Sequence, residues 1–245
     1  MKLLFWNIGY APGLDGSLKD YTLNAHRFLR LSEKQQKVVL DEVAHVIEQE
    51  SPDVALYAEI SLGSGRNQKF DQHKYLLSQF KGIKAEAAAS KYRDVYMDKL
   101  PLHTGNANGF ISWQDCKVEE VHFSVGRKSL VYVIEVNGIT ILMVHMGLQR
   151  KTRAVQFREL AELVNALKGP VVVCGDMNIF GGVEELQELQ ALTGLELPTD
   201  IPFTYPAFSP KQTLDLCLVR DCAKVHLSAL SSKVSDHAPI LIEIE

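Results

Sequence analysis

Acid, amide and imidazole side chains stand at the ends of apolar runs along this sequence. They are Asn7, Glu59, His145, Asp176 with Asn178, Asp215, and Asp236 with His237. The ends of strands lie at the rim of a sheet, where clefts form and rigid backbone can hold a reacting group. We therefore expect these side chains to converge on one pocket, where they could bind a hard cation and transfer protons.

Asn7 and Glu59 are the candidates for binding a cation. The amide of Asn7 could offer a neutral oxygen to a metal, although capping the following turn is the more common role of such a residue. Glu59 directly follows the apolar run VALYA. A carboxylate at a buried strand end needs a partner, which is either a metal or a salt bridge.

The segment GDMN places Asp176 and Asn178 two residues apart. In extended backbone both side chains point the same way, which suits the activation and orientation of a water. An Asx turn after the strand is an equally good interpretation. His145 follows the run ITILMV. A single histidine at a strand end is more often structural, so a functional role for His145 is supported only by the other candidate residues.

The segments LDLCLV and SDHAP contain the remaining acids and a second histidine. Asp215 lies between leucines, where a buried carboxylate is costly unless it is paired, and His237 is a candidate partner. A carboxylate that holds an imidazole keeps it protonated and able to stabilise charge on a phosphoryl oxygen. Asp236 and His237 are adjacent, so in extended backbone they serve different tasks.

The composition is that of an ordinary globular protein. Hydrophobic residues make up 46% and charged residues 23%, and the formal charge is −4 with a pI near 6.1. No global positive field gathers polyanions, which disfavours a processive DNA-binding protein. A local basic rim could still bind phosphates, and its candidates are Lys91, Arg93, Lys99, Arg127, Lys128, Arg150, Lys151 and Arg153.

The four cysteines, Cys116, Cys174, Cys217 and Cys222, form no CxxC pair and are expected to be reduced and structural. The first residues lack the apolar segment of a signal peptide, and no run approaches the roughly 18–20 residues that span a bilayer. We therefore expect a cytoplasmic protein without a membrane span.

Apolar periodicity predicts an α/β protein that forms one domain over residues 1–245. A strand at 3–8, a long loop at 9–31, a helix at 33–50 and a strand at 53–57 suggest a βαβ-like opening. The Asn137 and Gly138 pair predicts a hairpin. The other elements are expected as helices at 67–80, 152–167 and 184–192, a loop at 91–108, and strands at 83–89, 109–113, 117–123, 129–136, 139–145, 214–219, 224–230 and 239–244. The segment VVVCGDMNIF, residues 171–180, is expected as a buried strand that ends in a polar turn.

Taken in order, these segments resemble the endonuclease/exonuclease/phosphatase superfamily, which includes deoxyribonucleases, abasic-site endonucleases, neutral sphingomyelinases and inositol-phosphate 5-phosphatases. The resemblance covers nearly the whole chain and rests on FWNIG, AEI, GNANGFIS, VHMGL, GDMN, LDLCLV and SDHAP. Ala58 stands where the family usually has a glutamine. The resemblance implies a four-layer αββα sandwich of two mixed β-sheets flanked by helices.

The resemblance also implies a role for each candidate. Glu59 would be the principal ligand of Mg²⁺, with Mn²⁺ as the alternative, and Asn7 and Asp236 would complete the site. Asp176 would activate the attacking water, which Asn178 would orient. His237, held by Asp215, would stabilise charge on phosphorus, while His145 would bind a phosphoryl oxygen. Asn106 or Asn108 would add a phosphate contact.

The expected function is metal-dependent hydrolysis of a phosphoester, with nucleic acid or a small or lipid phosphodiester as the substrate. Mg²⁺ prefers oxygen ligands and acts as a Lewis acid on phosphoryl oxygens, which agrees with these residue types. One alternative is a phosphomonoesterase that acts on a sugar or inositol phosphate. Another is an inactive member of the same fold that uses the cleft for binding.

Overall fold

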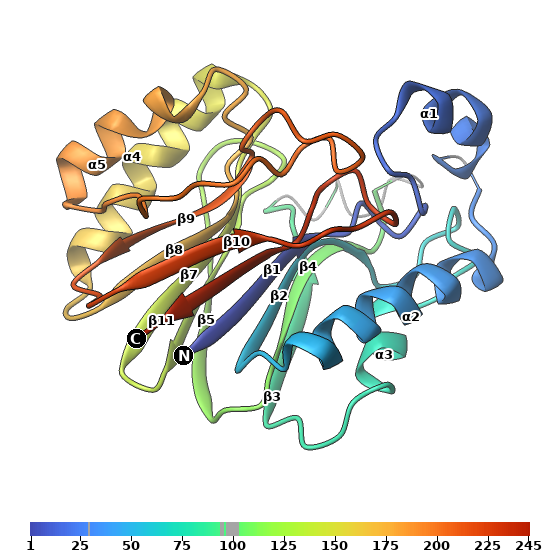
Figure 1. Cartoon of the computed structure of the whole chain (residues 1–245), viewed down its shortest axis with the longest axis horizontal. Helices are drawn as coiled ribbons and strands as arrows, with labels where there is room; N and C mark the ends of the chain where they lie inside the picture. The colour runs from blue at the N-terminus through green and yellow to red at the C-terminus, as the bar shows by residue number, and fades with distance from the viewer. Residues whose placement is uncertain (29, 94–95, 97–102) are drawn as a thin grey trace.

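Two β-sheets form the centre of the structure (Figure 1), a computed structural model that describes residues 1–28, 30–93, 96 and 103–245. The six-stranded sheet has the order β10-β11-β1-β2-β4-β3, and the five-stranded sheet has the order β5-β6-β7-β8-β9. The first comprises β1 Lys2–Asn7, β2 Val54–Ser61, β3 Ala85–Ser90, β4 Asn106–Ser112, β10 Val225–Ala229 and β11 Ile240–Ile244. The second comprises β5 Cys116–His122, β6 Leu130–Val136, β7 Ile139–His145, β8 Val171–Asp176 and β9 Asp215–Arg220.

Both sheets are mixed, because β1 pairs with β2 and β7 pairs with β8 in parallel, whereas the other neighbours are antiparallel. Helices cover the two outer faces, α4 and α5 on one side and α2 and α3 on the other (Figure 1). The helical segments are α1 Leu18–Asn24, η1 Ala25–Phe28, α2 Glu33–Glu50, α3 Gln72–Leu77, α4 Arg150–Ala166, η3 Val183–Leu186 and α5 Gln187–Thr193. The predicted α/β sandwich is confirmed.

The apolar core divides into two clusters, as the layers require. In one cluster, side chains of both sheets pack together and against α4, as Phe5, Tyr132 and Leu160 do. In the other, the outer face of the six-stranded sheet packs under α2, as Trp6 and Leu40 do. Strands buried on both faces are uniformly apolar rather than alternating, and β8 is the clearest case because all six residues are buried.

Local sequence encodes α2 and the β6–β7 hairpin as predicted. Ser32 caps α2 and forms a capping box with Gln35, and the helix ends at a left-handed Ser51 before Pro52. Asn137 and Gly138 both have positive φ, 49° and 78°, the conformation that a two-residue hairpin turn requires. The parallel pairing of β1 with β2 confirms the βαβ-like opening.

Three predicted segments were wrong in extent. The helix predicted at 67–80 is reduced to α3, because Gln68 and Lys69 have positive φ and Asp71 caps a later start. The loop predicted at 91–108 ends early, because β4 begins at Asn106 and is fully buried between β2 and β3. The loop predicted at 9–31 contains α1 and η1.

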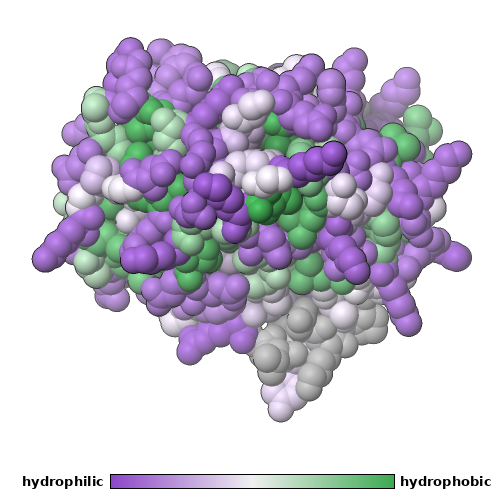
Figure 2. All heavy atoms as spheres, turned by 90° about the horizontal axis from the view of Figure 1, so that it is seen from below, coloured by the Kyte–Doolittle hydropathy of each residue, from purple (hydrophilic) through white to green (hydrophobic). Residues whose placement is uncertain are grey.

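The two chain ends lie side by side (Figure 1), since the amino group of Met1 donates to the carbonyl of Ile244 at 2.6 Å. On the face shown in Figure 2, apolar side chains are scattered among hydrophilic ones, as on most water-facing surfaces. Among the described residues, no helix combines the length and apolar character needed to cross a membrane.

Candidate active site

The carboxylate of Asp176 is the point at which residues from distant parts of the sequence meet. Its Oδ2 accepts a hydrogen bond from Asn7 Nδ2 at 3.0 Å and lies 3.1 Å from His145 Nε2. All three side chains are buried. Strand pairing explains the meeting, because the register places Asp176 directly opposite His145 on β7 and opposite Asp215 on β9.

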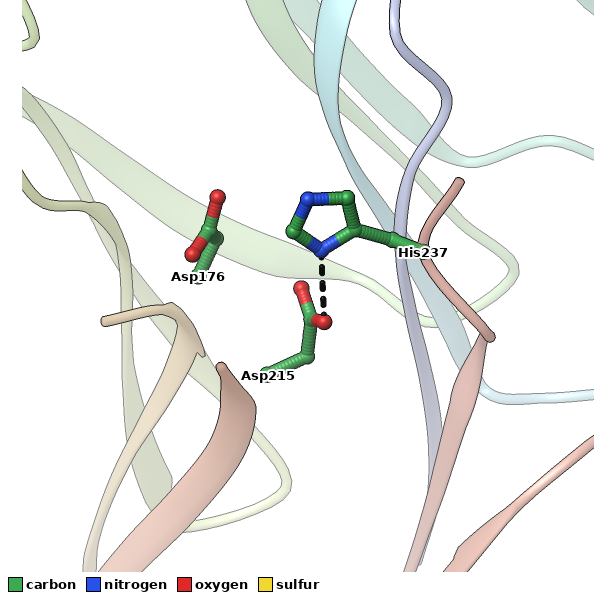
Figure 3. Close-up of side chains that lie close together, drawn as sticks. All are labelled: Asp176, Asp215 and His237. Carbon is green, nitrogen blue, oxygen red and sulfur yellow. Dashed lines mark hydrogen bonds and ion pairs between the residues drawn. The ribbon is translucent and has the colours of Figure 1, made fainter. Parts of the chain in front are cut away.

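Asp215 and His237 form a hydrogen-bonded pair beside Asp176 (Figure 3). Nδ1 of His237 is 2.7 Å from Asp215 Oδ2, and both residues are buried. Burial by itself lowers the pKa of His237, but the carboxylates of Asp215 and Asp176 outweigh it and raise that pKa. His237 is therefore a protonated imidazole at neutral pH, and Asp215 is its counterion.

Asp176, Asp215 and His237 together form a buried cluster whose polar atoms lie within 4.8 Å of one another, a spacing that would also suit a metal ion. The carboxylates of Asp215 and Asp176 raise the pKa of His237, which favours the imidazolium over the neutral imidazole that binds a metal.

Asn178 follows Asp176 in an Asx turn rather than in extended backbone. Its φ is 50°, and its backbone N–H donates to Asp176 Oδ1 at 3.0 Å. The side-chain amide donates to the carbonyl of Met146 at 2.8 Å, which fixes its orientation. Of the two interpretations that the sequence left open, the structure shows the turn, and the turn holds both side chains at the end of β8.

Glu59 occupies a strained position on β2. Its φ is 58°, a left-handed conformation that non-glycine residues rarely adopt, and the pairing of β2 with β4 shifts register between Tyr57 and Ile60. The backbone N–H of Glu59 donates to Asn108 Oδ1 at 3.2 Å. Asn108 thus stabilises the bulge that turns Glu59 toward the site, and such strain is typical of functional positions.

Two lysines surround the Glu59 carboxylate. Lys91 Nζ and Lys128 Nζ lie 3.4 and 3.5 Å from Glu59 Oε1, and His145 Nε2 lies 3.8 Å from the same atom. Burial alone would raise the pKa of Glu59, but the ammonium groups of Lys91 and Lys128 lower it well below its usual range. The salt bridge that the sequence offered as the alternative partner of Glu59 is therefore present.

His145 is neutral in this setting. Burial, reinforced by the adjacent Lys128 ammonium, lowers its pKa to about 4 despite the nearby carboxylates. Its Nε2 contacts Lys128 Nζ, and its buried Nδ1 has no hydrogen-bond partner among the described residues. The two histidines of the site therefore differ in charge, His145 neutral and His237 cationic.

The fit of a divalent cation can be judged from the donors and charges present. Glu59, Asn7 and Asp176 supply carboxylate and amide oxygens, the ligands that Mg²⁺ and Mn²⁺ prefer. The four carboxylates, at positions 59, 176, 215 and 236, exceed the three cations, Lys91, Lys128 and protonated His237, by one negative charge. A divalent cation together with a singly charged phosphodiester would balance that excess. The residues fit the group.

Asp236 and its neighbour His237 contact different partners. Asp236 Oδ2 accepts a hydrogen bond from Tyr21 of α1 at 2.6 Å, and this contact holds α1 against the site. The loop before α1 passes close by, and a Cβ on Gly16, whose φ is 87°, would lie 3.0 Å from Cβ of Asp236. Sequence patterns carried no signal for Tyr21, because α1 has no buried residue to create a periodicity.

The predicted phosphate contacts separate into two kinds. The side-chain oxygen of Asn108 accepts the hydrogen bond from the Glu59 backbone. Asn106 instead lines a pocket beside the site, and its Nδ2 donates to the Tyr92 hydroxyl at 3.0 Å. The same pocket is lined by Lys91, Arg127 and Lys128 from the predicted basic rim.

The rest of the predicted rim lies elsewhere. Arg153 is buried in an ion pair with Glu185, and Arg93 lines a different pocket. Arg150 and Lys151 are exposed at the start of α4, and Lys99 lies outside the described residues. Two pocket residues that the sequence did not single out, Arg66 and Tyr10, come from loops without a motif.

A comparison of the sequence with models of protein families agrees with this fold and site. A model of the Endonuclease/Exonuclease/phosphatase family matches residues 4–237. The chain belongs to this family. Its members are hydrolases that act on phosphoesters, and they generally use divalent metals. No curated protein matches the chain in sequence.

Solved structures share the fold at low identity. An endonuclease/exonuclease/phosphatase family protein from Leptotrichia buccalis is 15% identical with a TM-score of 0.68, covering 100% of this chain and 99% of that one. The beta toxin of Staphylococcus aureus is 16% identical with a TM-score of 0.66 and 100% coverage of both chains. TDP2 of D. rerio, complexed with a single strand DNA product, is 13% identical with a TM-score of 0.67, covering 100% and 98%.

Proposed function

We propose that this member of the endonuclease/exonuclease/phosphatase family is a divalent-metal-dependent phosphodiesterase that hydrolyses its substrate by in-line attack of water. The observation that carries the proposal is the convergence of Asn7, His145 and His237 on the Asp176 carboxylate. Asp176 is then the base, and a charged imidazole, His237, and phosphate-binding groups lie around its carboxylate. This is the set that in-line attack at phosphorus requires.

Asp176 accepts the proton of the attacking water. The imidazolium of His237 is the first group that counteracts the effect of burial, and together with His145 it lowers the pKa of Asp176 well below its usual range. Asp176 is therefore ionised at neutral pH, and its lowered pKa makes it a weak base. Proton transfer occurs late, after the water oxygen has begun to bond to phosphorus and its protons have become acidic. The Asx turn at Asn178 keeps the carboxylate oriented for this step.

His237 stabilises the negative charge that builds up on the phosphoryl oxygens as the new P–O bond forms and the ester P–O bond breaks. Asp215 keeps the imidazole protonated and aligned. His145 and Lys128, which contact each other beside Asp176, bind another phosphoryl oxygen.

Glu59 and Asn7, with Asp176 close by, would hold the metal, which when bound supplies Lewis-acid polarisation of the phosphate. Lys91 and Lys128 lie 3.4 and 3.5 Å from Glu59 Oε1, so with a cation bound to the carboxylate the two ammonium groups would be available to substrate anions. Asp236, which accepts a hydrogen bond from the Tyr21 hydroxyl, supports the residues that would hold the metal.

The test compares hydrolysis of bis-p-nitrophenyl phosphate with that of p-nitrophenyl phosphate, in Mg²⁺ or Mn²⁺ and in EDTA. Wild-type protein should hydrolyse the diester in metal alone, and Asp176→Asn should lose about 100-fold to 10,000-fold of that activity, the range typical of general-base catalysis. Asp115→Asn is the matched control, because Asp115 is exposed in a surface ion pair with Lys84. It should retain full activity.

Three results would contradict the proposal in different ways. Faster turnover of the monoester would assign a phosphatase acting on sugar or inositol phosphates. Activity that survives EDTA would exclude the metal. Inactivity on both esters, combined with no binding of Mg²⁺ in calorimetry, would favour an inactive binding protein with this fold.

A further inference from the structure

A pocket of about 670 Å³ adjoins the Asp176 cluster. Lys128 belongs to its wall and also contacts His145, which lies 3.1 Å from Asp176. Lys128 and His145 therefore connect the pocket to Asp176, the proposed base. Other pockets lie at the paired chain ends and beneath α2, and their lining residues share none with the candidate site.

The charge of this pocket is one-sided. Its described lining contains four cationic side chains and no carboxylate; the four are Arg66, Lys91, Arg127 and Lys128. Glu59, just outside the lining, contacts both lysines but can neutralise only one of them. Within the described part of the chain, no carboxylate forms an ion pair with Arg66 or Arg127.

Tyr10 adds a polar group that lacks a partner. Its ring contacts two cations, with Arg66 Cζ and Lys91 Nζ each 4.9 Å from the ring centroid. Its hydroxyl is buried and has no hydrogen-bond partner among the described residues. A buried hydroxyl without a partner is costly, and an anion in the pocket would accept its hydrogen bond.

We propose that the pocket binds a second phosphoryl group of the substrate, so that the substrate is a small phosphoester that carries another phosphate besides the scissile one. This inference rests on the proposed function for the position of the scissile group. Arg66 and Arg127 recognise the second phosphate, because they are the lining cations that Glu59 does not contact. The volume is in the range of small-molecule pockets, and the net charge of −4 disfavours a long polyanion.

Binding in EDTA tests the pocket without turnover. Calorimetry should show thymidine 3′,5′-bisphosphate binding at least tenfold more tightly than thymidine 5′-phosphate, since one charge-assisted hydrogen bond has about this effect. Arg66→Gln and Arg127→Gln should each remove most of that preference. Arg158→Gln removes the same charge from an exposed pair with Glu188 and should leave the preference unchanged. Equal binding of the two ligands, or a preference that survives both pocket variants, would overturn the inference.

Turnover separates this inference from the proposed function. Thymidine 5′-(p-nitrophenyl phosphate), with and without a 3′-phosphate, is assayed in Mg²⁺, and the 3′-phosphorylated ester should have the higher kcat/KM. Equal turnover of both esters would sink the inference and leave the function standing. No turnover of either, with the binding preference intact, would overturn the function and retain the pocket. A tetrathymidylate that binds more tightly than the bisphosphate would show that the second phosphate belongs to a strand and not to a small molecule.

Discussion

The two sides of the candidate site satisfy their buried carboxylates in different ways. Around Asp176 and Asp215 the partners are an amide and two imidazoles at hydrogen-bond distances. Strand pairing aligns His145 and Asp215 with Asp176, whereas Asn7 comes from β1 of the other sheet and His237 from the loop before β11. Around Glu59 the partners are two lysine ammonium groups at 3.4 and 3.5 Å, attached to long side chains. In the mechanism that we propose, the first side is preorganised for proton transfer, whereas the second can exchange its cations for others.

This difference indicates which side of the site can rearrange when ligands bind. Strand register fixes Asp176 against its neighbours, so its geometry cannot change without breaking a ladder. Glu59 stands on a bulge at positive φ, and lysine side chains have many rotamers. A cation and a substrate would rearrange the Glu59 side and leave the Asp176 side in place.

Replacing Glu59 should have the largest effect on the adaptable side. Glu59→Gln leaves Lys91 and Lys128 without a counterion, which should lower the free energy of unfolding by about 3 kcal/mol in urea titrations. It should also lower metal-dependent activity at least 100-fold and abolish the rise in Tm that Mg²⁺ gives wild-type protein. A variant that is as stable as wild type, with an intact Mg²⁺ response, would mean that Glu59 neither neutralises the lysines nor binds the metal.

Removing the counterion of His237 probes the preorganised side through pH. The Asp215 carboxylate raises the pKa of His237, and the imidazolium is present below that pKa and lost as pH rises through it. Asp215→Asn should therefore move the alkaline limb of kcat/KM to lower pH, with about a 10-fold to 100-fold loss at neutral pH. An unchanged alkaline limb would show that His237 does not act as a cation. Asp221→Asn, at an exposed turn, is the control.

The smallest effect is expected at the contact between α1 and the site. Tyr21→Phe removes the hydrogen bond to Asp236 but keeps the ring, so kcat should change by less than about threefold and stability by about 1 kcal/mol. Faster proteolysis within residues 18–24 would show that the bond holds α1 in place. A loss as large as that of Asp215→Asn would instead place Tyr21 in the reaction itself.

Sequence alone determined the elements whose signals are local. Ser32 and Gln35 delimit α2, the Asn137 and Gly138 pair forms a hairpin, and continuous apolar runs mark the buried strands. The order of polar residues at strand ends was also sufficient to predict the family and the α/β sandwich. The cap, the hairpin turn and the apolar runs depend on near neighbours in the chain, so their physical causes are present in short segments.

Tertiary structure decided the contacts between these residues. Strand pairing, not spacing, places Asp176 beside His145 and Asp215, because the partners are 31 and 39 positions away in the chain. Of the two interpretations that the sequence left open at positions 176 and 178, the turn is the one that forms, closed by the Asn178 N–H on Asp176 Oδ1 and held by the Asn178 amide on the distant Met146 carbonyl. The charged pocket is decided at the same level, since Arg66 and Lys128 carry no periodic signal and approach each other only when the two sheets pack together.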